Sequence, residues 1–145
     1  MNLSTFNTLD AASARKELFA CCGSNKWTDL MMNHFPFTSE KQLVDLFAKI
    51  WYDECDASDW RESFTHHPKI GDVKSLTEKF AGKEQAGVAV ATQETIQFLA
   101  KANSDYEAKN GFIFIVCATG KSADEMLALL LDRFQNTPEE ELHIA

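Results

Sequence analysis

Residues 39–51 read SEKQLVDLFAKIW and carry the clearest structural signal in the chain. Ser39 followed three residues later by Gln42 has the form of a capping box, in which the two side chains satisfy N–H groups at the start of a helix. Apolar residues then recur every three or four positions, as on one face of a helix: Leu43, Leu46, Phe47, Ile50 and Trp51. The stretch therefore predicts an amphipathic α-helix.

The flanking segments repeat the helical period. Residues 9–22 form an apolar face that Gly23 ends, and a short helix is expected around residues 27–34. A further helix runs from about Asp59 to His66 or His67, because the following proline closes it.

The second half of the chain gives four more helix starts. Asp72 can cap a short helix, and a long helix begins near Lys83 and stops at residues 110–111. Ser122-x-x-Glu125 caps another, and Thr137-Pro138-Glu139-Glu140 is a strong final start. A helix that ends five residues later could hardly stand alone, so we expect the C-terminal helix to continue beyond Ala145.

Residues 112–117, FIFIVC, depart from this pattern. By propensity they resemble a strand, but no second strand-like run exists to pair with them. We therefore expect an irregular, extended, buried segment over residues 112–118. The predicted fold is all-α, a single domain over residues 1–145 with about seven or eight helices.

Composition narrows the class of protein. The 145 residues are 45% hydrophobic, which fits one globular core, and the net charge of −8 argues against nucleic acid or an anionic membrane as partner. The four cysteines form no Cys-x-x-Cys pair, and no signal peptide or membrane-spanning run is visible. A cytoplasmic protein with reduced thiols is the expectation.

Two polar stretches carry candidate chemistry. His67 precedes Pro68 at a predicted helix C-terminus, where carbonyl groups favour the protonated imidazole and burial disfavours it, so it can titrate near neutral pH. Glu84 and Gln85 lie in the first turn of the long helix, where an anion is stabilised and an amide suits a urea group. The alternatives are a histidine that only ends a helix and an ordinary acidic first turn.

Together these stretches resemble the 2-oxo-4-hydroxy-4-carboxy-5-ureidoimidazoline (OHCU) decarboxylase family of the urate pathway, over nearly the whole chain. The matching residues, in order, are Trp60; His67-Pro68-Lys69-Ile70-Gly71; Glu84-Gln85-Ala86-Gly87; Tyr106-x-x-Lys109-Asn110-Gly111-Phe112-x-Phe114-Ile115-Val116-Cys117-Ala118; Gly120-Lys121-Ser122; and Pro138-Glu139-Glu140-Glu141-Leu142.

The resemblance implies an all-α homodimer that converts the anionic ureidoimidazoline to (S)-allantoin and CO2 without metal or organic cofactor. It implies His67 and Glu84 as catalytic residues, with His67 as the acid/base and the Glu84–Gln85 pair holding the substrate. The residues it implies for substrate binding are Pro68, Ala81, Gln85, Phe114, Ile115, Val116, Cys117 and Ala118.

The chain departs from the family pattern in three places. Ala81 and Phe80 stand where the family usually has Ser and Trp, and the link from His67 to Glu84 is shorter than expected. The family's substrate-binding Arg near the C-terminus has no match here, since Arg15, Arg61 and Arg133 do not fit its motif, and we expect it beyond residue 145.

Two other classes stay open. A non-enzymatic helical binding module would explain the amphipathic helices. A metal-dependent hydrolase could use His66 and His67, but adjacent histidines point apart on a helix and no His-x-His or His-x-x-x-His pair exists. The enzyme hypothesis requires that His67 and Glu84 meet across a cavity floored by residues 112–118.

Overall fold

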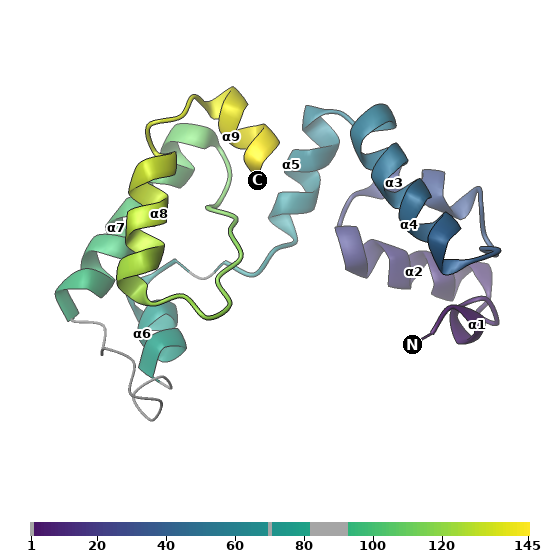
Figure 1. Ribbon diagram of the computed structural model, residues 1–145, viewed down its shortest axis with the longest axis horizontal. Helices are drawn as coiled ribbons and strands as arrows, with labels where there is room; N and C mark the ends of the chain where they lie inside the picture. The colour runs from purple at the N-terminus through teal and green to yellow at the C-terminus, as the bar shows by residue number, and fades with distance from the viewer. Residues whose placement is uncertain (1, 70, 82–92) are drawn as a thin grey trace. The chain divides into compact units, whose positions relative to one another are not determined.

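A computed structural model describes residues 2–69, 71–81 and 93–145 of the chain. The chain divides into two compact units, Met1–His67 and Pro68–Ala145, each of which is built from helices (Figure 1). All regular secondary structure in the described residues is helical, so the all-α prediction is confirmed. The single-domain prediction stays a prediction.

The N-terminal unit contains six helical elements. They are α1 (Leu3–Phe6), α2 (Ala11–Cys22), α3 (Asn25–Met32), α4 (Glu40–Lys49), the π-helix η1 (Ile50–Glu54) and α5 (Ala57–Thr65). Asp10, Ser24 and Ser39 cap α2, α3 and α4 by accepting N–H bonds from the first turn, and Gly23 ends α2 in the left-handed conformation.

The cap of α4 is only half of the predicted box. The Ser39 side chain accepts from the Gln42 N–H, as predicted. The Gln42 side chain, however, accepts from the N–H and hydroxyl of Thr38, one residue before the cap. The Thr38–Gln42 hydrogen bonds therefore take the place of the second bond of the capping box.

The core of the N-terminal unit is aromatic and aliphatic. Its buried residues include Leu18, Trp27, Met31, Phe37, Ile50 and Cys55. Two indole N–H groups bond to carbonyl oxygens near the π-helix: Trp27 to Phe47 at 3.4 Å and Trp60 to Trp51 at 3.1 Å. Of the predicted inward face of α4, Phe47 is 42% exposed, although its ring packs edge-on against Trp27.

The C-terminal unit contains α6 (Val73–Ala81), α7 (Gln93–Asn110), α8 (Ala123–Arg133) and α9 (Pro138–Ile144). Helices α7 and α8 lie side by side (Figure 1). Ser122 with Glu125 and Thr137 with Glu140 form the capping boxes that the sequence predicts. The predicted start of the long helix near Lys83 lies outside the described residues.

The segment between α7 and α8 is irregular, as predicted. Gly111 leaves α7 with φ of 75°, and residues 113–118 have no regular secondary structure. The predicted burial holds only in part: Phe112 is buried, residues 113–116 are half-buried and Cys117 is exposed. The segment therefore has a side that is covered and a side that is accessible.

Two further predictions concern the cysteines and membrane-spanning segments. All four cysteines are free thiols in the structure. No helix among the described residues combines the length and apolar character that crossing a bilayer would need.

Gly23 offers a test of how α5 is held. Its φ is +74°, and an added Cβ would lie 2.8 Å from the Cβ of His66. We expect Gly23→Ala to lower the free energy of unfolding by about 2–4 kcal/mol, from left-handed strain and steric overlap together. The measurement is urea denaturation.

Gly120→Ala is the matched control. Gly120 has a similar φ of +76°, but no atom of the described residues lies within 4 Å of an added Cβ. It should lose only the strain contribution, about 1–2 kcal/mol. Equal losses in the two variants would contradict the packing of His66 against Gly23.

Candidate active site

His67 lies just beyond the end of α5. The helix ends at Thr65, His66 is its C-cap, and the His67 N–H donates to the Phe64 carbonyl at 3.2 Å. The helix therefore ends one or two residues before the end that the sequence predicts, at His66 or His67. His67 and Pro68 are both exposed, which leaves the imidazole accessible to a small molecule.

His66 fixes the backbone that leads to His67. Its ring packs edge-on against Phe19 at a centroid distance of 4.9 Å and covers Gly23. His66 is exposed by surface area, but it also has this structural contact. The neighbouring histidine is free of such packing, so the two adjacent histidines differ in role.

The predicted partners of His67 are not placed. Glu84 and Gln85 lie outside the described residues. Ala81 is the last residue of α6. The meeting of His67 and Glu84 therefore stays a prediction, as do the roles of Ala81 and Gln85.

The irregular segment is anchored on its covered side. Arg133 at the end of α8 donates from Nη1 to the Ile115 carbonyl at 2.7 Å. The Phe114 ring contacts the Arg133 guanidinium at 4.8 Å and the Tyr106 ring, edge-on, at 5.2 Å. At the far end, the Lys121 N–H donates to the Ala118 carbonyl at 3.3 Å. Five of the predicted substrate-binding residues, 114–118, therefore lie between these two backbone anchors.

The backbone N–H groups of the irregular segment differ from its carbonyl groups in their hydrogen bonding. Within the part of the chain that the structure describes, no protein group accepts a hydrogen bond from the backbone N–H groups of residues 113–117. Backbone donors that are shielded from bulk water need an acceptor, which a ligand can supply. The segment can therefore present donors to a ring carbonyl or a ureido oxygen.

A buried ion pair supports the anchor. Glu141 of α9 is fully buried and accepts from Arg133 Nη2 at 2.7 Å, from Asn136 at 2.7 Å and from the Tyr106 hydroxyl. Burial raises the pKa of Glu141, but the hydrogen bonds from Arg133, Tyr106 and Asn136 outweigh it, and the net pKa is lowered. Burial and the bond to Glu141 raise the pKa of Tyr106. Tyr106 is therefore a neutral donor and Glu141 a stable anion.

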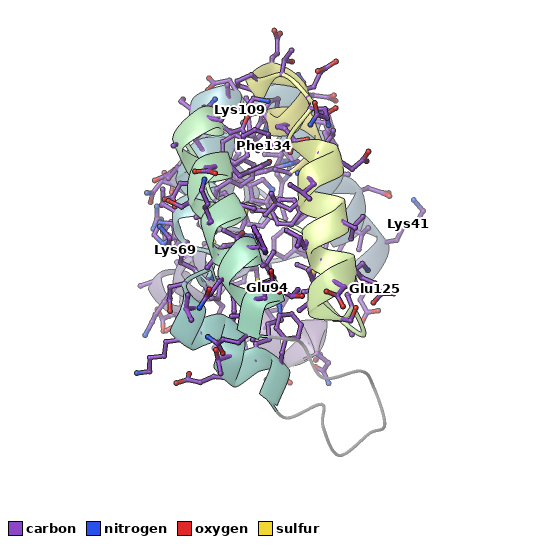
Figure 2. All side chains as sticks on the ribbon, turned by 90° about the vertical axis from the view of Figure 1, so that its left-hand side faces the viewer. Lys41, Lys69, Glu94, Lys109, Glu125 and Phe134 are labelled. Carbon is purple, nitrogen blue, oxygen red and sulfur yellow. The ribbon has the colours of Figure 1, made fainter. Side chains whose placement is uncertain are left out.

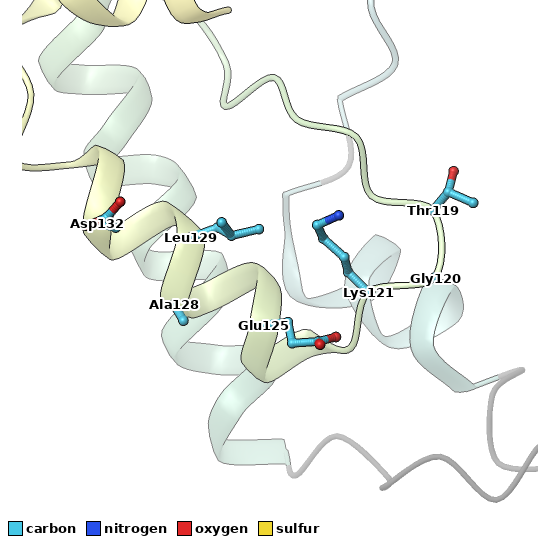
Figure 3. A pocket seen from close by; sticks show the side chains of 7 residues that line it. All are labelled: Thr119, Gly120, Lys121, Glu125, Ala128, Leu129 and Asp132. Atoms are coloured by element: carbon cyan, nitrogen blue, oxygen red, sulfur yellow. The ribbon is translucent and has the colours of Figure 1, made fainter.

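The segment ends beside an open hollow with a volume of about 620 Å³. Its lining residues are Thr119, Gly120, Lys121, Glu125, Ala128, Leu129 and Asp132. Figure 3 shows the side chains of Lys121 and Leu129 extending toward each other across it. Hydrogen bonds from the Thr119 backbone and side chain, with the charge of Lys121, lower the pKa of the Cys117 thiol. The hollow has both charge signs at its rim.

Sequence reasoning did not identify Arg133, Glu141 and Tyr106 as a unit. Tyr106 and Glu141 belonged to the stretches that carry the family resemblance, but their partner was not visible. The available signal was Glu141, which directly precedes Leu142 on the inner face of a short helix. A glutamate that is buried in this way requires a cationic partner. Among the described residues, no three His, Cys, Asp or Glu side chains are grouped to hold a metal ion.

The lowered pKa of Glu141 predicts acid sensitivity. A carboxylate whose pKa is lower in the folded state stabilises the fold fully above its unfolded pKa, near 4.5, and less as pH falls through the folded value. We expect the free energy of unfolding to fall below pH about 4.5, measured by urea denaturation between pH 7 and 3. Glu141→Gln should lose about 3–5 kcal/mol at pH 7, because Arg133 keeps a buried charge, and should show a shallower acid slope. An unchanged slope in Glu141→Gln would contradict this source of the pH dependence.

Three comparisons with known proteins place the chain. The model of the family OHCU decarboxylase matches residues 7–145. The uric acid degradation bifunctional protein TTL of Arabidopsis thaliana is 36% identical over 131 residues, which cover 86% of this chain and 40% of that protein. The chain therefore spans less than half the length of this curated relative.

A solved structure agrees with this match. A crystal structure of OHCU decarboxylase in the presence of (S)-allantoin superposes with a TM-score of 0.70 at 35% identity, and the match covers 89% of this chain and 85% of that one. The family match extends over both compact units. From its sequence and its fold, this chain belongs to the OHCU decarboxylase family.

Proposed function

We propose that this chain decarboxylates 2-oxo-4-hydroxy-4-carboxy-5-ureidoimidazoline to (S)-allantoin and CO2 in urate degradation. The observation that carries the proposal is the family match over residues 7–145. The likeness to a decarboxylase structure determined with (S)-allantoin supports the same product class. The proposal concerns the decarboxylation alone, since the Arabidopsis relative is a longer, bifunctional protein.

The substrate supplies its own electron sink. The carboxylated carbon lies next to a C=N bond, so when the bond to CO2 breaks its electron pair forms a C=C bond and the imine pair moves to nitrogen, which takes a proton. The hydroxyl on the former carboxylated carbon then loses its proton as the neighbouring carbon gains one. The protein needs to orient the ring and to move protons stereospecifically.

His67 is our candidate for the proton transfers. Its imidazole is exposed beyond α5, on a backbone that the His66 packing holds in place. An imidazole can accept the hydroxyl proton and donate to carbon near neutral pH. Glu84 would orient His67 or a substrate N–H, and Pro68, Ala81 and Gln85 would line the site.

The irregular segment is our candidate for reading the ring and ureido amides. The N–H groups of residues 113–117 have no acceptor in the described part of the chain, and Arg133 and Tyr106 fix the segment from behind. The substrate carboxylate is left without an assigned partner. Arg133 is unsuited to it, because Glu141 already neutralises its charge.

The oligomeric state, the location and the partners complete the proposal. We propose a homodimer in the cytoplasm that acts on a small anionic substrate, without nucleic acid, membrane, metal or organic cofactor. Light scattering with size exclusion at micromolar concentration tests the dimer directly.

The decisive experiment follows chirality. The ureidoimidazoline is prepared fresh from urate, protein is added, and circular dichroism records the appearance of allantoin. We expect rapid formation of the S enantiomer, well ahead of the slow racemic decay without protein. Decay at the uncatalysed rate with a folded chain would contradict the enzyme proposal and favour a helical binding module.

The role of His67 has its own test. We expect His67→Asn to lose about 10²–10⁴ in kcat, the typical contribution of a general acid/base. His34→Asn is the control, since it makes the same chemical change at another exposed histidine, outside the stretch around His67. Thermal melts establish that both variants fold. Near-normal kcat in folded His67→Asn would remove His67 from the mechanism.

A further inference from the structure

Arg133 uses its guanidinium on three groups at once. Nε and Nη2 donate to the Glu141 carboxylate at 3.0 and 2.7 Å, and Nη2 also lies 3.3 Å from the Tyr106 hydroxyl. Nη1 is directed elsewhere, to the Ile115 carbonyl at 2.7 Å. The planar fork of arginine allows this division, which a single ammonium could not reproduce.

The neighbouring contacts hold Arg133 in one orientation. Its side chain is 13% exposed, Glu141 is fully buried, and the Phe114 ring lies against the guanidinium. Lys109 secures the turn between α8 and α9 by donating to the carbonyls of Phe134 and Asn136, and its ammonium lies over the Phe134 ring (Figure 2). Lys109 therefore supports the same helix junction without bonding to residues 112–118.

The bond to Ile115 has a consequence for the next residue. The peptide unit is planar and trans, so the C=O of Ile115 and the N–H of Val116 point in opposite directions. A carbonyl held against Arg133 therefore directs the Val116 N–H away from the guanidinium. That N–H is one of the donors without an acceptor among the described residues.

We propose that Arg133 is a positioning residue for the decarboxylation, which it serves by fixing the Ile115–Val116 peptide so that the Val116 N–H is aimed at the substrate. Glu141 and Tyr106 hold the guanidinium in place, and Arg133 itself does not touch the substrate. This inference rests on the proposed function, because it assigns a donor to that function's ligand.

The test compares two variants that each replace a basic side chain at the same helix junction. Arg133→Lys keeps a charge for Glu141 but cannot reach Ile115 at the same time. Lys109→Gln weakens the α8–α9 turn and leaves the Arg133 contacts intact. We expect Arg133→Lys to weaken (S)-allantoin binding, measured by calorimetry, and to lower kcat/KM, each by up to about tenfold, the usual effect of losing one hydrogen bond to the ligand, here from the Val116 N–H.

Amide NMR provides a measurement that a general loss of fold stability does not change. In Arg133→Lys the Val116 amide resonance should shift and its hydrogen exchange should accelerate, at a temperature where both variants are folded. Lys109→Gln should keep the wild-type Val116 resonance, the allantoin affinity and kcat/KM even when its melting temperature falls as far.

The outcomes separate the two proposals. Equal losses of affinity in both variants, or wild-type affinity and an unshifted Val116 amide in Arg133→Lys, would overturn the positioning role. A wild-type protein that neither decarboxylates nor binds allantoin would contradict the proposed function itself. The Val116 resonance would still report whether Arg133 fixes the peptide.

Discussion

The C-terminal unit depends on the burial of one ion pair. A carboxylate removed from water is tolerated only when its lone pairs are satisfied, and Glu141 has donors from Arg133, Tyr106 and Asn136. These donors come from α7, from α8 and from the turn before α9. The ion pair therefore requires α7, α8 and the turn before α9 to be in place together. The remaining donor of Arg133, Nη1, fixes the irregular segment.

Helix α9 takes part in the same contacts. In proteins, most helical stability comes from tertiary packing and less from helix propensity. Helix α9 has a complete capping box at its start, and it buries Glu141 and Leu142 against the rest of the unit. Tertiary contacts stabilise α9 where helix propensity is insufficient.

The N-terminal unit uses polar groups differently. Two of its buried hydroxyls are satisfied by backbone carbonyls: Thr28 donates to the Ser24 carbonyl, and Ser63 donates to the Cys22 carbonyl. The second bond joins α5 to the end of α2, where Gly23 also receives the His66 ring. No buried charge is needed there, and the backbone before His67 is positioned by neutral hydrogen bonds and packing.

Local signals were predictable from the sequence, and tertiary ones were not. Helix caps such as Ser122 with Glu125 involve residues three apart, so the pattern contains the whole interaction. The irregular segment was predictable because a lone strand-like run has no partner. The partial exposure of the segment, the end of α5 before His67 and the partnership of Arg133 with Ile115 depend on how separate elements meet, which periodicity does not encode. The pairing of His67 with Glu84 stays a prediction for the same reason.

The stretch from Tyr106 to Ala118 is better understood as scaffold than as chemistry. Tyr106 and Lys109 are three residues apart and so share a face of α7. Tyr106 binds the Glu141 carboxylate, and Lys109 binds the carbonyls that end α8. Neither side chain is free to react: Tyr106 supports, through Arg133, the backbone that would bind the ligand, whereas Lys109 supports only the turn between α8 and α9. Under the proposed function, resemblance in this stretch concerns a surface that would bind the ligand, whereas the proposed proton chemistry would depend on the stretch around His67 and on Glu84. Loss of catalysis and loss of binding should accordingly be separable by mutation.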